Sequence, residues 1–355
     1  MSARKALFRG AAVSPGLLVF AAAAGAAPVA TPPPNCNAAF NAYAYTQQAL
    51  SSCTNIRTFP QSAVKGMPGG GTETDYNVDG VLYQYFTPPA GFNPSTATDA
   101  QLKEYGLPPR PADASGQAAW DASVGKASAT NPAPFLTELP GVSADTVNLA
   151  NWSGYAVSGA NGTYNQSSSE WYEPQYGSSV CSGASAVIWD GIGGYGGGTL
   201  GQDGTLYNVP GASNHGAWSE VYPNQNIVPQ FLLSTPGSQF IAETQWTGSA
   251  WHFYMQDTAS GNSLSYNVNI NAYSGQSAEA IGERPTINGS LSPLANFGTL
   301  SFTKSTANGT SLDQYSPSGV RHGVHMYNSG TGHYLAEPGN IGSNGAFADQ
   351  QEHCI

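Results

Sequence analysis

The chain carries little positive charge, with 11 Lys and Arg among 355 residues against 22 Asp and Glu. The shortage is greatest after residue 148, where Arg284, Lys304 and Arg321 accompany 13 acidic residues and the formal charge is −10. Such a surface repels phosphate backbones, which argues against a nucleic-acid partner. It also tolerates acid, because only three cations would be left to repel one another once the carboxylates are protonated. An extracellular β-protein rich in Gly, Ser and Asn would have the same composition.

Several catalytic signatures are missing. The sequence has no G-x-S-x-G nucleophile elbow, and no cysteine stands in a setting that suggests a thiolate nucleophile. His322, His325 and His333 lie in a Gly-rich tail and could bind a metal. They lack the glutamate of an H-E-x-x-H helix, and imidazole holds a metal poorly in acid, so we interpret them as solvated loop histidines. We expect no metal and no cofactor, which leaves carboxylate and amide chemistry.

Long apolar runs are also missing, except near the N-terminus. Arg4, Lys5 and Arg9 precede an apolar run over residues 11–24, and small residues with A-x-A spacing follow. This is the pattern of a secretory signal, expected over residues 1–27. A membrane anchor would need about 20 uninterrupted apolar residues, and Pro15-Gly16 interrupts this run. We expect a secreted, extracellular and monomeric protein with no membrane contact after the signal is removed.

Cysteines are few. Cys36, Cys53, Cys181 and Cys354 fit an oxidising compartment, and none has metal-ligand spacing. Spacing does not determine their pairing. If the chain is cut near residue 148, the pairs Cys36–Cys53 and Cys181–Cys354 would keep each bridge within one piece.

The N-terminal part of the chain has the composition of a pro-segment. Residues 28–35 form a Pro-rich linker, and residues 36–110 contain helix-compatible stretches such as residues 38–50. Residues 108–147 are rich in Pro, Ala, Ser and Asp, which indicates an exposed connector open to cleavage. We expect a propeptide and linker over residues 28–148 that act as an intramolecular inhibitor, with self-cleavage between about Pro132 and Asn151 on acidification.

The residue pattern of the sequence changes from Asn151 onward. Short apolar and aromatic runs alternate with turn residues, and residues 264–270 show a clear period of two. This pattern predicts an all-β domain over residues 149–355, a two-sheet antiparallel β-sandwich of the concanavalin A-like or jelly-roll type. The predicted strands lie at residues 152–157, 169–172, 186–192, 216–221, 240–246, 251–255, 264–270 and 298–302.

Six short motifs occur in order within this domain. They are residues 151–154 (NWSG), 189–194 (WDGIGG), 200–204 (LGQDG), 217–223 (AWSEVYP), 278–283 (AEAIGE) and 297–302 (FGTLSF). In this order the chain resembles the eqolisin family of glutamic peptidases, secreted acid endopeptidases, over roughly residues 151–302. The resemblance implies polypeptide substrates.

The resemblance also implies residue roles. The catalytic glutamine of the family falls on Gln202, and its catalytic glutamate falls on Glu283. Trp189 and Trp218 match aromatic residues of the substrate cleft, and Glu220 matches an acidic residue close to the catalytic pair. Trp152, in the NWSG motif, is a further substrate-binding candidate.

A glutamate and a glutamine suit peptide hydrolysis in acid. The reaction needs a base for water, a donor for the oxyanion and an acid for the leaving amine. A carboxylate can serve as base and then as acid, and an uncharged amide donates at any pH, whereas a histidine base would be protonated. The order in which Glu283 acts, as base or as acid, stays open at this point.

Other interpretations remain beside this one. Gln202 could be a hairpin residue before the turn pair Asp203-Gly204, Glu283 a solvated strand residue, and the tryptophans core residues. The chain also departs from the family pattern at Asp190, Gly193, Ser219 and Gly282. A lectin-like carbohydrate-binding sandwich is one alternative function. Another is a glycosidase using Glu220 and Glu283, which would need carboxyl groups about 5.5 Å or about 6.5–9.5 Å apart.

Overall fold

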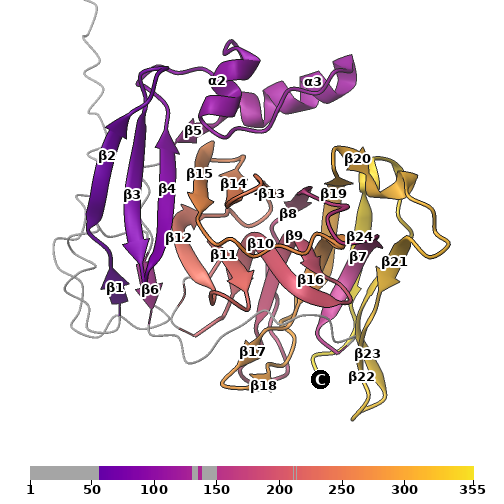
Figure 1. Ribbon diagram of the computed structural model, residues 1–355. Helices are drawn as coiled ribbons and strands as arrows, with labels where there is room; N and C mark the ends of the chain where they lie inside the picture. Colours follow the sequence, from indigo (N-terminus) through magenta and orange to yellow (C-terminus); the bar gives the residue numbers. More distant parts are fainter. Residues whose placement is uncertain (1–55, 130–134, 138–149, 211, 213) are drawn as a thin grey trace, which may run out of the picture.

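The computed structural model describes residues 56–129, 135–137, 150–210, 212 and 214–355. Two antiparallel sheets of different size make up most of this part of the chain (Figure 1). The expected signal peptide, the pair Cys36–Cys53 and the helix-compatible residues 38–50 lie outside the described residues. No helix within the described ranges has the length and hydrophobicity that a membrane span requires.

The smaller sheet has seven strands in the order β12-β11-β10-β9-β16-β7-β21. All of its strand pairs are antiparallel. The strands are β7 (Trp152–Ser158), β9 (Ala186–Gly194), β10 (Gly197–Tyr207), β11 (Gly216–Tyr222), β12 (Val228–Leu233), β16 (Ser277–Glu283) and β21 (Arg321–Val324).

The larger sheet follows the order β2-β3-β4-β15-β14-β13-β8-β19-β24-β23-β22, and short strands β20 and β5 pair with β19 and β15. Its strands from the C-terminal part are β8 (Gln166–Tyr172), β13 (Gln239–Trp246), β14 (Trp251–Asp257), β15 (Asn262–Val268), β19 (Thr299–Ala307), β20 (Thr310–Ser311), β22 (Met326–Asn328), β23 (His333–Pro338) and β24 (Phe347–Gln351). A separate hairpin joins β17 (Thr286–Ile287) to β18 (Ser290–Leu291), and 3-10 turns lie at Leu312–Gln314 and Ser343–Gly345.

Alternation of side chains explains why the two sheets pack face to face. On β14, Trp251, Phe253 and Met255 join one large buried cluster, which also contains Ile188 of β9 and Ala280 of β16. Every second residue of a strand points to the same face, so both sheets place an apolar face in this common interior. The predicted β-sandwich is therefore confirmed, and each of the eight predicted strands lies on an observed strand.

One local prediction was wrong. Asp203-Gly204 is not a turn, because both residues lie within β10 and are buried. A Cβ atom on Gly204 would stand 1.9 Å from the carbonyl oxygen of Ile188 on β9. The glycine is thus required for close approach of two strands rather than for chain reversal.

The N-terminal region contains strands that the sequence interpretation missed. β2 (Gln61–Gly66), β3 (Thr72–Val78) and β4 (Val81–Thr87) form a meander, and β4 pairs with β15 (Figure 1). The larger sheet therefore runs across the expected boundary at residue 148. The remaining elements of this region are β1 (Ile56–Thr58), α2 (Asp99–Glu104), α3 (Ala114–Ala122), the 3-10 turn Val124–Lys126, β5 (Ser128–Ala129) and β6 (Phe135–Thr137).

The expected exposed connector is also partly folded. α3 begins after the N-cap Asp113, whose side chain accepts from the backbone N–H of Gly116. Trp120 of α3 is 5% exposed and packs with Val124, Leu102 and Tyr254. An aromatic residue of this size stabilises a packed segment by burial, which the Pro- and Ala-rich composition concealed.

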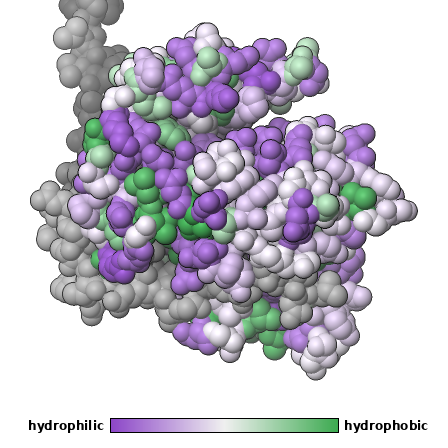
Figure 2. Space-filling view, in the orientation of Figure 1, coloured by the Kyte–Doolittle hydropathy of each residue, from purple (hydrophilic) through white to green (hydrophobic). Residues whose placement is uncertain are grey.

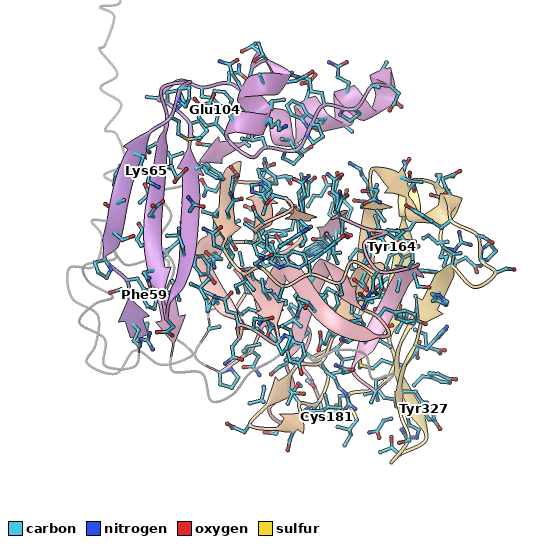
Figure 3. The ribbon with its side chains drawn as sticks, in the orientation of Figure 1. Phe59, Lys65, Glu104, Tyr164, Cys181 and Tyr327 are labelled. Atoms are coloured by element: carbon cyan, nitrogen blue, oxygen red, sulfur yellow. A yellow bond between two sulfur atoms is a disulfide. The ribbon has the colours of Figure 1, made fainter. Side chains whose placement is uncertain are left out.

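A disulfide joins Cys181 to Cys354, a pairing that cysteine spacing left open, with Cα atoms 6.1 Å apart across 173 residues. Cys181 lies in the loop before β9, at the opposite end of the molecule from Glu104 of α2 (Figure 3). The bond ties the C-terminus to the loop that leads into the central strand of the smaller sheet. The oxidising compartment inferred from the cysteines is consistent with it.

Candidate active site

The two proposed catalytic residues lie on one face of the smaller sheet. Central strand β9 separates β10 from β16. Gln202 of β10 pairs with Gly191, and Glu283 of β16 pairs with Val187. Gly191 and Val187 are an even number of residues apart, so Gln202 and Glu283 project from the same face. This is the outer face, because the opposite residues of β9, such as Ile188, point into the sandwich interior.

The other site candidates share this face. Glu220 of β11 pairs with Gln202, and Trp218 pairs with Gly204, which in turn pairs with Trp189. Trp152 of β7 pairs with Glu283. Six side chains that are far apart in the sequence thus gather on one surface because five adjacent strands are in register.

Two N–H donors hold the carboxyl group of Glu283. The indole nitrogen of Trp189 donates to Oε2 at 2.8 Å, and the amide nitrogen of Asn151 donates to Oε1 at 3.0 Å. Trp152 packs edge-on against Trp189, with ring centroids 4.7 Å apart. Donors on both oxygens fix the orientation of the carboxyl plane, as a group that handles protons requires.

The side-chain amide of Gln202 is held by Glu220. Its Nε2 donates to Oε2 of Glu220 at 2.8 Å. Trp218 donates instead to the backbone carbonyl of Thr205 at 3.0 Å, so its indole N–H anchors β11 to β10. The structure therefore joins the candidates in two hydrogen-bonded groups, Gln202 with Glu220 and Glu283 with Trp189.

All six candidate residues are fully buried, each with an exposed fraction of 0%. An apolar cluster surrounds them on the outer face and includes Leu200, Leu206 and Ile281. Such surroundings strengthen hydrogen bonds and charges by excluding water. In the full-length chain the site is closed to solvent.

The visible surface of the molecule is mostly hydrophilic with separate apolar patches (Figure 2).

Sequence reasoning gave no role to two residues around this site, Asn151 and Glu279. Asn151 stands in the NWSG motif, but the residue pattern gave it no role. Glu279 lies on the outer face of β16 and accepts from the backbone N–H of Tyr195 at 3.2 Å. Burial raises the pKa of Glu279 well above its ordinary value. The signal was available, because Glu279 and Glu283 are four residues apart on one strand.

A second group of acids lies on the interior face of the same sheet. Asp190 and Asp203 oppose each other across β9 and β10, and Oδ1 of Asp203 accepts from the Thr244 hydroxyl at 2.8 Å. Burial raises the pKa of Asp203 to about 7, and burial together with the Asp203 charge raises the pKa of Asp190 well above its ordinary value. Asp349 of β24 accepts from the Ser153 hydroxyl at 2.6 Å, and burial raises its pKa to about 7.

The three tail histidines have separate surroundings. His322 lies 2.8 Å from the Ser158 hydroxyl, His325 lies 3.1 Å from Oε1 of Glu337, and His333 stacks on His353. Within the described part of the chain no group of three or more His, Cys, Asp or Glu residues could hold a metal ion.

Comparison with known proteins places this chain in a family. The Peptidase A4 family model matches residues 150–339. The structure is similar to Scytalido-glutamic peptidase with a peptide-based transition state analog, at 19% identity and a TM-score of 0.46, covering 57% of this chain and 98% of that chain. It is also similar to SCP-B, a member of the eqolisin family of peptidases in complex with the tripeptide Ala-Ile-His, at 16% identity and a TM-score of 0.44, with the same coverage. The search of curated proteins gave no match. The family model spans more than half of the 355 residues. The chain therefore belongs to the Peptidase A4 family, the eqolisins, and is a glutamic-type peptidase.

Proposed function

We propose that this protein is a secreted endopeptidase that works in acid through Gln202 and Glu283. The observation that carries the proposal is the register of β10, β9 and β16, which puts one amide and one carboxyl group on the same buried face. Their hydrogen-bonded partners, Glu220 and Trp189, come from the same motif set. A single surface thus supplies both a proton-transferring group and an uncharged donor.

In the proposed reaction Glu283 acts first as a base and then as an acid, and Gln202 donates a hydrogen bond to the oxyanion. Glu283 takes a proton from water as the water oxygen attacks the peptide carbonyl carbon, and an N–H of Gln202 donates to the oxyanion that forms. The protonated Glu283 then gives its proton to the amide nitrogen of the substrate as the C–N bond breaks. A carboxamide has two N–H donors, so Glu220 can orient Gln202 through one while the other acts on the oxyanion.

The buried acids support an acidic working range. Burial raises the pKa of Asp203, Glu243 and Asp349 to about 7, and the pKa values of Asp190 and Glu279 lie well above ordinary. These groups are neutral in acid, so the fold then buries no carboxylate charge at these positions. A histidine-based peptidase would lose its base in the same medium.

The closed site supports a zymogen. Gln202 and Glu283 are fully buried in the full-length chain, so a polypeptide can reach them only after a cover is removed. We assign that inhibition to the N-terminal segment expected as a propeptide. Cleavage between about Pro132 and Asn151 on acidification would start activity.

Digestion of casein from pH 2 to pH 7 tests the proposal. Gln202→Ala should lower kcat by roughly 10²- to 10³-fold, as loss of an oxyanion donor does, and Glu283→Gln should abolish turnover. Circular dichroism should show both variants folded. Full activity in either folded variant would remove the assignment of that residue.

The two alternative functions receive less support. A lectin-like module needs no buried carboxyl and amide groups on a closed face, and it does not explain the family match. In a glycosidase that uses Glu220 and Glu283, Gln202 would be dispensable. The Gln202→Ala variant therefore separates the glycosidase from the peptidase.

A further inference from the structure

Residues 56–129 complete the larger sheet of the sandwich. β4 pairs with β15 in antiparallel register, with Tyr85 opposite Tyr266 and Tyr83 opposite Val268. The backbone N–H of Asn269 also donates to the carbonyl of Leu82 at 2.9 Å. Without β4, β15 would be an open sheet edge with unpaired backbone groups.

The same strands contribute to the common interior. Tyr83 and Tyr85 are 0% exposed and belong to the buried cluster between the sheets. Tyr85 stacks on Tyr266 with ring centroids 4.7 Å apart, and its hydroxyl donates to Oε1 of Gln230 on β12 at 2.5 Å. This part of the N-terminal region therefore joins both sheets rather than lying on the surface.

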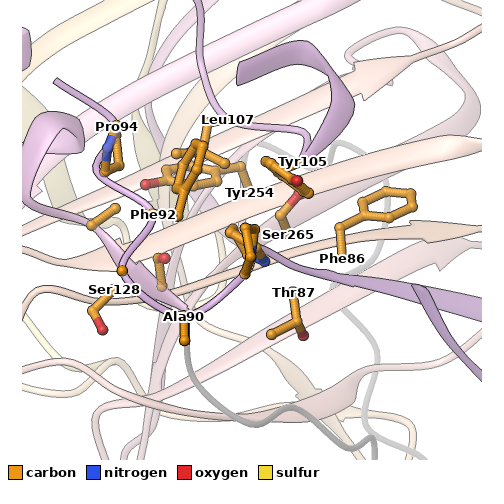
Figure 4. Close-up of a pocket in the computed structure, with 15 residues that line it drawn as sticks. Phe86, Thr87, Ala90, Phe92, Pro94, Tyr105, Leu107, Ser128, Tyr254 and Ser265 are labelled. Carbon is orange, nitrogen blue, oxygen red and sulfur yellow. The ribbon is translucent and has the colours of Figure 1, made fainter. Parts of the chain in front are cut away.

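The helical part covers the outer face of the larger sheet. Leu102 and Trp120 pack against Ile241 and Tyr254 in one apolar cluster. The Gln256 amide donates to the carbonyl of Ser123 at 3.0 Å. A pocket of about 260 Å³ has a lining that mixes Phe92, Tyr105 and Leu107 with Tyr254 and Ser265 of the sandwich (Figure 4). Both parts of the chain thus form the walls of this pocket.

Charge contributes little to this contact. Every ion pair of residues 56–129 within the described ranges has both partners in that region, including Lys65–Glu73 and Arg110–Asp99. Loss of carboxylate charge in acid therefore removes no attraction between the two parts.

Two buried titratable side chains of the sandwich face this region. His252 lies 3.0 Å from the carbonyl of Gly106, and burial lowers its pKa although the hydrogen bond to that carbonyl favours the protonated ring. Glu243 lines the groove under α3, and burial raises its pKa to about 7, so it is neutral in acid. The remaining charged side chains of that groove are Arg110, Asp113, Glu170 and Lys304. Glu170 pairs with Lys304, so both partners of this ion pair belong to the sandwich.

We propose that residues 56–129 are a lasting, non-covalently bound part of the mature enzyme, and that a cut between residues 129 and 150 does not release them. This rests on the proposed zymogen and deepens it, because part of the N-terminal segment stays with the enzyme after the cut. The retained part would hold β15 and the outer face of β13 and β14 while the site works on the opposite sheet.

The test uses an engineered cut so that it does not depend on peptidase activity. A recognition sequence for a site-specific protease replaces residues 140–147 in a Glu283→Gln background, which blocks self-cleavage. After complete cutting, size-exclusion chromatography with light scattering at pH 7 and pH 4 should show one peak with the mass of the uncut chain. Intact-mass analysis of that peak should show both pieces in equal amounts. Separate elution of the N-terminal piece at either pH would overturn the proposal, whether or not the wild-type enzyme digests casein.

Two glycine variants give a matched control. Gly106 and Gly91 both have positive φ values, +62° and +79°, so an alanine is strained at either position. A Cβ on Gly106 would lie 2.3 Å from the ring of His252 and from the Ser265 hydroxyl, whereas a Cβ on Gly91 meets nothing within 4 Å. Gly106→Ala should raise the dissociated fraction of the cut protein at least 10-fold over Gly91→Ala. Equal dissociation of the two variants would contradict the assigned contact.

Discussion

The two faces of the smaller sheet carry acids and amides in opposite settings, although the residues alternate along the same strands. On the outer face, the carboxyl group of Glu283 receives N–H donors from Trp189 and Asn151. On the interior face, Asp190 and Asp203 lie opposite each other across two strands, and both have raised pKa values. The outer face orients the carboxyl group of Glu283 with two donors, whereas the interior face brings two carboxyl groups with raised pKa values opposite each other.

The difference links chemistry to stability. The proposed reaction on the outer face uses a carboxyl group and an amide, which can still act in a medium where a histidine base would be protonated. The interior face is free of buried charge only in that medium, because a buried carboxylate costs free energy when it ionises. The same acidic pH range therefore suits the proposed reaction and keeps the buried acids neutral. Three measurements test this account of the two faces.

The largest expected effect is on stability against pH. A buried acid whose folded pKa lies above its unfolded value of about 4 contributes fully below that value and loses its contribution as pH rises through the folded pKa. Because five buried acids behave in this way, the free energy of unfolding should fall by several kcal/mol between pH 4 and pH 8. His252 acts in the opposite direction below about pH 6.5, since burial lowers its pKa. Urea unfolding across this range measures the sum, and a stability that rises toward pH 8 would contradict it.

Asp349→Asn isolates one of these acids. An asparagine keeps the acceptor for the Ser153 hydroxyl but cannot ionise. Since the pKa of Asp349 is raised to about 7, the variant should be more stable than wild type by up to about 4 kcal/mol at pH 8 and equal to it at pH 4. Glu352→Gln on the exposed surface is the control, with no change expected at either pH. The same gain at both pH values would show that packing, not ionisation, explains the variant.

The smallest expected effect is the difference in kcat between variants of two tryptophans on the outer face. Trp189 and Trp218 are both fully buried, but only Trp189 donates to Glu283, while Trp218 donates to a backbone carbonyl. Trp189→Phe should lower kcat by about 10- to 100-fold through misorientation of Glu283. Trp218→Phe should change kcat less than about 3-fold at comparable stability, since it leaves the reacting groups in place. Equal losses in steady-state assays would show that Trp189 acts only by packing.

Much of the sandwich follows from its alternating pattern, but local turns do not. The dipeptide Asp-Gly occurs at residues 79–80, 190–191 and 203–204, and the second and third pairs lie within strands β9 and β10. At Asp79-Gly80 both residues have positive φ, and the chain reverses between β3 and β4. At Asp203-Gly204 the chain continues as a strand, because Gly204 allows β9 to approach. The first pair, between runs rich in Tyr and Thr, was a usable signal for the missed N-terminal strands.

The site residues could be predicted from the order of the six motifs and are brought together by the strand register, whereas composition alone did not identify them. Gln202 and Glu283 are ordinary strand residues until six motifs in order give them roles, and the contact of Asn151 with Glu283 spans 132 residues of sequence. Three of the four departures from the family pattern have a common location. Asp190, Ser219 and Gly282 all point to the interior face, where a Cβ on Gly282 would lie 3.2 Å from Oδ2 of Asp349. They accompany the buried acids and leave the outer face intact.

A double-mutant cycle on Gln202 and Glu283 tests the central claim most directly. The rates of casein hydrolysis at the wild-type pH optimum are compared for wild type, Gln202→Ala, Glu283→Gln and the double variant, all in protein cut by the engineered protease site. If both groups act on one water and one carbonyl, the double variant should be no slower than the slower single variant, because residues of one unit are not additive. Losses that multiply, or a Glu283→Gln enzyme that keeps wild-type activity, would contradict the account.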